Sequence, residues 1–207
     1  MLRAEGRGLF ITLEGVDGAG KSTHVEEIAA RLRAAGREVL VTREPGGTTF
    51  AEKLRALILT DAIDPIPETL LMFAARADHV ARMIRPALER GVSVVCDRFT
   101  DATVAYQGGG KGIARPLIER LAEVTHPGLK PDLTLIFDCS YEVSRSRLAG
   151  AGRTLDRFER ENQAFFERVR AAYLELGRAE PARVRVIDAS QPLPEIKKQL
   201  EQIIGSI

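Results

Sequence analysis

The stretch GVDGAGKST, residues 15–23, decides the fold of this chain. It fits the pattern G-x-x-x-x-G-K-[ST] at every fixed position. Its glycines let the backbone wrap around an anion, and the helix that should follow points its positive dipole end at the same anion. Lys21 supplies a charge for the outer phosphates, and the Ser22 hydroxyl is placed to bind Mg²⁺. The stretch therefore predicts a nucleoside triphosphate site, most simply for ATP, formed by Gly15, Val16, Asp17, Gly18, Ala19, Gly20, Lys21, Ser22 and Thr23.

The segments around this loop have the periodicity that such a site requires. The β-rich run 9–14 precedes it, and Val25, Ile28 and Leu32 recur at helical spacing after it. Helical periods also separate the further apolar runs, which indicates a parallel sheet with helices on both faces. We expect one domain over residues 1–207, with a three-layer α/β/α P-loop NTPase fold and a five-stranded parallel sheet whose other strands are 38–42, 92–97, 132–138 and 184–188.

Two further segments stand out. Apolar residues between Leu70 and Leu88 trace one long helix, with Pro67 near its start and Gly91 at its end. Residues 144–158 are rich in arginine and contain a Gly-Ala-Gly break, so we interpret them as a mobile lid rather than a core element.

Composition limits the possible functions. The formal net charge is +1, so bulk charge gives no support for binding nucleic acid or a membrane surface. Arginine outnumbers lysine 24 to 6; its planar fork suits phosphate, although codon bias would give the same excess. Cys96 and Cys139 lie in apolar runs and read as reduced core residues, and no apolar stretch is long enough to span a membrane, so we expect a cytoplasmic location.

The motif alone leaves several classes of nucleotide-binding protein open. A GTP switch needs N-K-x-D, which does not occur in the sequence, and a motor or transport ATPase is normally larger. A small-molecule kinase needs a second pocket, and Asp97 and Arg98 emerge from the strand 92–97 where ligands bind in such sheets. Phe73 and Arg76 share a helix face that could hold a planar base. Spacing alone, however, places Phe73 equally well in the core.

Taken together, the motifs resemble those of the bacterial thymidylate kinases over essentially the whole chain. The resemblance rests on LEGVDGAGKST (13–23), TREPGGT (42–48), FAAR (73–76), CDRF (96–99), AYQGGG (105–110), RTLDRFE (153–159) and VIDA (186–189), in that order. It implies transfer of the ATP γ-phosphate to dTMP, a Mg²⁺ cofactor and a homodimer.

The resemblance also implies roles for individual residues. Phe73 would stack on thymine, Arg76 would hydrogen-bond its O4, and Tyr106 would close the floor under the deoxyribose. The implied dTMP-binding residues are Asp17, Arg55, Phe73, Arg76, Arg98, Thr103, Tyr106 and Gln107. The implied catalytic residues are Lys21, Arg98 and the lid arginines Arg147, Arg153 and Arg157, and Ser22 and Asp97 would hold the metal.

Two features of the sequence qualify this reading. The family usually places the stacking aromatic four residues before the arginine, whereas Phe73 is three before Arg76, so either Phe73 or Met72 could face the base. The P-loop carries no arginine, which matches the subtype with basic residues in the lid. A kinase for dUMP or UMP is the alternative enzyme, and a nucleotide-dependent switch is the alternative class.

Overall fold

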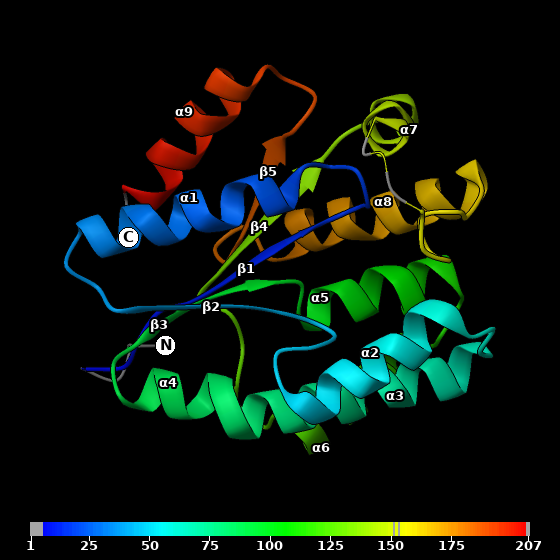
Figure 1. Cartoon of the computed structure of the whole chain (residues 1–207), viewed down its shortest axis with the longest axis horizontal. Coiled ribbons are helices and arrows are strands. Elements are labelled where there is room, and N and C mark those ends of the chain that lie inside the picture. Colours follow the sequence, from blue (N-terminus) through cyan, green and yellow to red (C-terminus); the bar gives the residue numbers. More distant parts are fainter. Residues whose placement is uncertain (1–5, 151, 153, 206–207) are drawn as a thin grey trace.

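The architecture is a parallel sheet between two layers of helices (Figure 1). A computed structural model describes residues 6–150, 152 and 154–205. The five strands lie in the order β2-β3-β1-β4-β5 and pair in parallel throughout. Their bounds are β1 Phe10–Gly15, β2 Val39–Arg43, β3 Ser93–Asp97, β4 Leu133–Asp138 and β5 Val184–Asp188, each within a residue or so of its sequence prediction.

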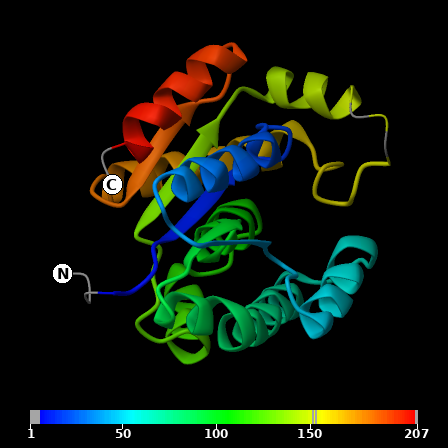
Figure 2. The same cartoon turned by 60° about the vertical axis from the view of Figure 1, so that its left-hand side comes forward.

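Helices cover both faces of this sheet. Helices α1 and α9 pack on one face, whereas α8, α5 and α4 pack on the other, and α2 and α3 pack against each other beside it. Figure 2 shows α7 and α2 on either side of the region beyond the strand ends. The helices are α1 Lys21–Ala34, α2 Thr49–Thr60, α3 Pro65–His79, α4 Arg85–Glu89, α5 Thr100–Thr103, α6 Arg115–Thr125, α7 Tyr141–Ala149, α8 Gln163–Ala179 and α9 Leu193–Ile204.

The central strands are apolar because both of their faces are covered. Every residue of β1 is buried, as are the first four residues of β3. The two polar side chains inside β1 have partners: the Thr12 hydroxyl lies 2.9 Å from that of Thr134, and Glu14 accepts hydrogen bonds from α8 and the end of β3. Within the described residues, no helix is both long and apolar enough to cross a membrane.

The predicted long helix is present, but it is not α-helical throughout. A π-helical segment, Val80–Ile84, joins α3 to α4, and the N–H of Arg85 bonds to the carbonyl of Val80 five residues earlier. Pro86 explains the change, because proline lacks the N–H that would bond to the carbonyl of Arg82 and its ring crowds that carbonyl. The periodicity of the apolar residues does not reveal this widening.

Part of the segment that we interpret as a lid, residues 144–158, is helical. Residues 144–149 belong to α7, where Ser144 and Leu148 are buried. The Ser144 hydroxyl donates a hydrogen bond to the carbonyl of Asp17 at 2.7 Å, so this helix packs on the P-loop. Its N-cap Ser140, which accepts from the N–H of Val143, explains why an arginine-rich stretch is helical here.

We predict that Leu135→Ala, at the centre of β4, lowers the free energy of unfolding by about 2–5 kcal/mol, because it leaves a cavity between two helix layers. Val186→Ala on β5, where the side chain is 43% exposed, is the control and should change stability by about 0.5 kcal/mol or less. Urea unfolding measures both. Equal losses would contradict the assignment of the core.

Candidate active site

The P-loop lies between β1 and α1 and lines a cavity of about 770 Å³, a size typical of ligand sites. Gly18 and Gly20 have positive φ angles of 74° and 91°, which glycine adopts without strain. The Lys21 ammonium donates to the carbonyls of Gly15 and Val16, at 3.0 and 2.9 Å. Burial and the neighbouring charge of Arg98 lower the pKa of Lys21. An incoming anion would offset both effects.

Asp97 ends β3 opposite the start of α1, as predicted. Its Oδ2 lies 3.4 Å from the Ser22 hydroxyl. Its Oδ1 is buried and makes no hydrogen bond within the described residues. An unpartnered carboxylate oxygen beside a hydroxyl suits a hard divalent cation, or a water molecule bound to one.

Arg98 stands at the junction between the P-loop and the rest of the site. Its φ of +72° turns the chain sharply after β3. One terminal nitrogen donates to Asp17 Oδ1 at 2.5 Å, and the other donates to the Gly15 carbonyl at 3.0 Å. Tyr106 donates its hydroxyl proton to Asp17 Oδ2 at 2.7 Å. Although burial would raise the pKa of Asp17, the charges of Arg98 and Lys21 outweigh it and lower that pKa.

A second cavity adjoins the first. The two share a set of lining residues, namely Asp17, Glu44, Arg55, Leu59, Arg98 and Asp156. Beyond this shared wall the second cavity is lined by Pro45, Met72, Arg76, Phe99, Ala102, Thr103, Tyr106, Gln107 and Phe158. Two elongated ligands could therefore meet end to end at Arg55 and Arg98.

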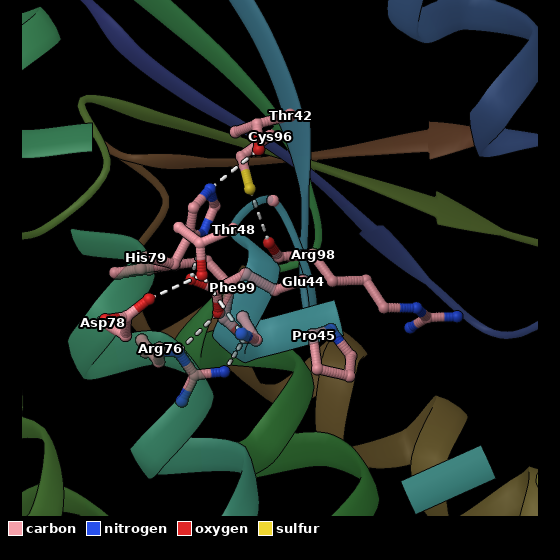
Figure 3. Close-up of polar contacts among 12 residues, drawn as sticks. Thr42, Glu44, Pro45, Thr48, Arg76, Asp78, His79, Cys96, Arg98 and Phe99 are labelled. Atoms are coloured by element: carbon pink, nitrogen blue, oxygen red, sulfur yellow. Dashed lines mark hydrogen bonds and ion pairs between the residues drawn. The ribbon is translucent and has the colours of Figure 1, made fainter. Parts of the chain in front are cut away.

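Arg76 lies on α3 and lines the second cavity. Figure 3 shows its guanidinium beside Glu44 and Phe99. Its Nε donates to Glu44 at 2.6 Å, and its Nη2 donates to the Phe99 carbonyl and the Thr103 hydroxyl, both at 3.1 Å. Its Nη1 is buried and has no hydrogen-bond partner within the described residues. Leaving a guanidinium N–H unpaired is costly, so this donor is available to an acceptor that enters the cavity.

The structure resolves the choice between Phe73 and Met72 for the lining of this cavity. Met72 lines the second cavity, whereas Phe73 does not and is only 1% exposed. The Phe73 ring instead packs beneath the guanidinium of Arg76, 4.8 Å from its centroid, and beside His126. The expectation that Phe73 faces a base is not supported, because its ring is buried against Arg76 and His126.

The predicted arginines do not all reach the cavities. Arg55 lines both, and its Nη1 donates to the Pro45 carbonyl at 2.8 Å. Arg147 lines the P-loop cavity and donates to the carbonyls of Ala19 and Ala189. Arg153 lies outside the described residues.

Arg157 does not lie where a catalytic arginine is expected. Its guanidinium donates to Glu68 and to the carbonyl of Ile58, and it lines neither cavity. The physical reason is Glu68, which is fully buried and gathers donors, because a buried carboxylate must be paired. Lys111 and Gln107 are its other partners, at 2.7 and 2.8 Å.

Sequence reasoning missed the carboxylates that support the arginines. Glu14 is fully buried and accepts from the N–H of Phe99 and the hydroxyl of Tyr173; burial and the charge of Asp101 raise its pKa to about 8. Glu44 holds Arg76, and Glu68 holds Gln107. Only Glu14 could have been recognised from the sequence, because an acidic residue inside an otherwise apolar strand indicates a buried carboxyl group with specific partners.

The site combines a P-loop at the carboxyl end of a parallel sheet with a second cavity that contains an unpaired donor. Arginines line the boundary between the two. These features are those of a P-loop kinase that acts on nucleotides. The thymidylate kinase family model matches residues 13–200, so the chain belongs to the thymidylate kinase family.

Individual relatives agree with this assignment. The chain is 55% identical over 203 residues to the thymidylate kinase of Pseudomonas savastanoi pv. phaseolicola, which covers 97% of this chain and 96% of the relative. It is 56% identical over 194 residues to that of Bordetella petrii, covering 94% and 93%. The crystal structure of thymidylate kinase from Ehrlichia chaffeensis is similar, with a TM-score of 0.78, 31% identity, and coverage of 96% of this chain and 99% of the other.

We predict that Arg157→Ala lowers the free energy of unfolding by about 1–3 kcal/mol, because Glu68 loses one of its buried donors. The effect on kcat should be small, since the guanidinium lines neither cavity. Thermal unfolding and steady-state kinetics on the same preparation measure the two. A large fall in kcat with an unchanged free energy of unfolding would show instead that Arg157 acts in catalysis.

Proposed function

We propose that this protein transfers the γ-phosphate of ATP to dTMP, in line and without a covalent intermediate, to give dTDP. The observation that carries the proposal is the pair of adjoining cavities. One is lined by a P-loop, and the other ends at the unpaired Nη1 of Arg76. Family membership supports ATP as the donor and dTMP as the acceptor.

The donor side is formed by the P-loop. Its N–H groups and the N-terminus of α1 would hold the phosphates, and Lys21 would move from the carbonyls of Gly15 and Val16 onto them. The charge that develops in phosphoryl transfer is spread over the oxygens of the transferred group. Preorganised cations therefore stabilise it directly, and Lys21 and Arg147 supply them on this side.

The acceptor side is formed by arginines held on rigid elements. Arg55 and Arg98 line both cavities, so they would grip the dTMP phosphate at the junction. Arg76 would donate its Nη1–H to O4 of thymine, with Met72 against the ring. The Gln107 amide nitrogen donates to Glu68, which leaves its oxygen to accept from the base N3–H.

Mg²⁺ fits the residues between β3 and α1. Ser22 and Asp97 would hold it, because the buried Oδ1 of Asp97 has no other partner among the described residues. When bound, the ion would neutralise part of the phosphate charge. One hydroxyl and one carboxylate provide few ligands, which is how Mg²⁺ is usually bound, with phosphates and water completing its shell.

We propose further that the enzyme is a homodimer and cytoplasmic. Helix α3 contacts both α2 and α6, and all three helices expose large apolar side chains. These are Phe50 and Leu57 on α2, Ile66 and Leu70 on α3, and Leu117 and Val124 on α6. A face of this kind on a small protein suits a second copy.

Both cysteines are buried and free, which agrees with a reducing compartment. Residues 144–158 remain our proposed lid.

A coupled assay for ADP release, run across dTMP, dUMP, UMP, dCMP and dGMP, tests the proposal. We expect turnover to be fastest with dTMP. Comparable turnover with dUMP or UMP would support the broader pyrimidine kinase, and tight nucleotide binding with no turnover would favour a switch.

We predict that Arg76→Ala raises KM for dTMP by about tenfold or more, because the base loses a buried charged donor worth roughly 1.5–3 kcal/mol. KM for ATP should stay within about twofold, since Arg76 does not line the P-loop cavity. Steady-state kinetics with each substrate varied in turn would show the difference. Equal increases in both constants would remove Arg76 from the base site.

A further inference from the structure

A chain of hydrogen bonds among buried polar side chains runs from Thr42 through His79 and Glu44 to Arg76 (Figure 3). The Thr42 hydroxyl on β2 lies 2.7 Å from His79 Nε2, and His79 Nδ1 lies 3.0 Å from Glu44 Oε1. Glu44 Oε2 then accepts from Arg76 Nε at 2.6 Å. His79 is fully buried and contacts neither cavity, so the proposed reaction gives it no direct role.

The direction of these hydrogen bonds follows from their chemistry. Burial would raise the pKa of Glu44, but the charge of Arg76 and the hydrogen bond from His79 outweigh it and lower that pKa. Glu44 is therefore ionised and can only accept, so His79 Nδ1 must carry a proton and donate it. One carboxylate oxygen is thus held by His79 and the other by Arg76, which fixes the carboxylate plane.

The same histidine supports the loop that carries Glu44. A Cβ on Gly47 would lie 2.5 Å from His79 Nε2, so the loop backbone packs directly on the imidazole. Thr48, at the end of this loop, donates its hydroxyl to Asp78 at 2.6 Å. The loop also presents the Pro45 carbonyl that Arg55 binds. Glu44 and Pro45 of this loop line the acceptor cavity, so one side of that cavity depends on a loop that packs against residues 78 and 79.

We propose that His79 is a positioning residue for the nucleoside monophosphate: by holding Glu44 Oε1 it orients Arg76 so that Nη1 faces the acceptor cavity. The inference rests on the proposed function, because it assumes that Arg76 binds the base. Loss of the Nδ1 contact would free the carboxylate to rotate, and Arg76 would follow it.

A matched pair of variants separates this role from simple packing. The amide nitrogen of Asn can occupy the place of His Nδ1, whereas that of Gln can occupy the place of Nε2. His79→Asn should therefore keep the contact with Glu44 and lose the one with Thr42, and His79→Gln should do the reverse. Thr42→Val is a second control that removes only the partner of Nε2.

Steady-state kinetics give the readout, after thermal unfolding has established that each variant is folded. We expect His79→Gln to raise KM for dTMP by about five- to twentyfold, the loss of roughly one hydrogen bond to a charged group. His79→Asn and Thr42→Val should stay within about threefold, and KM for ATP should stay within about twofold in all three. In the Arg76→Ala background, His79→Gln should add nothing further.

Equal effects of the Asn and Gln variants on KM for dTMP, or parallel increases in both KM values, would overturn the proposal. If His79→Gln does not fold, Glu44→Asp provides the test, because its shorter carboxylate cannot reach both His79 and Arg76. It should raise KM for dTMP more than KM for ATP, because Glu44 lines both cavities but holds Arg76, which lines only the second. The proposed function fails separately, if Arg76→Ala itself leaves KM for dTMP unchanged.

Discussion

The ion pair between Arg98 and Asp17 is the interaction on which the site depends. Asp17 belongs to the P-loop and Arg98 to the end of β3, so their 2.5 Å contact joins the triphosphate side to the acceptor side. Arg98 also donates to the hydroxyls of Tyr106 and Tyr173, and the Tyr173 hydroxyl in turn donates a hydrogen bond to Glu14. Since this network comes from four separate segments, folding itself assembles the junction between the two cavities.

Beneath this junction, acidic side chains hold several of the groups that would touch substrate, whereas backbone carbonyls hold Arg55 and Arg147. Glu44 orients Arg76, Glu68 orients Gln107, and Glu14 binds the N–H of Phe99 next to Arg98. Such preorganisation removes most of the conformational cost of forming a charged site when substrate arrives. The free-energy cost arises during folding instead, because each carboxylate that becomes buried must be paired with hydrogen-bond donors.

The sequence was sufficient for the sheet, the P-loop and the placement of Asp97 and Arg98, because apolar periodicity and the glycine pattern depend on local geometry. It was insufficient where long-range contacts decide. Arg157 binds Glu68, 89 positions away in sequence, and Phe73 turns into the core beside His126. The N-cap of α7, Ser140, is a local signal, but the packing of this helix on the carbonyl of Asp17 spans 127 positions. No local pattern encodes such pairings.

A crystal structure with dTMP and a non-hydrolysable ATP analogue bound together is the most direct test of the central claim. The account predicts the triphosphate on the P-loop, the dTMP phosphate within hydrogen-bond distance of Arg55 and Arg98, and thymine O4 on Arg76 Nη1. A dTMP molecule bound outside the second cavity, or with its base turned away from Arg76, would contradict it.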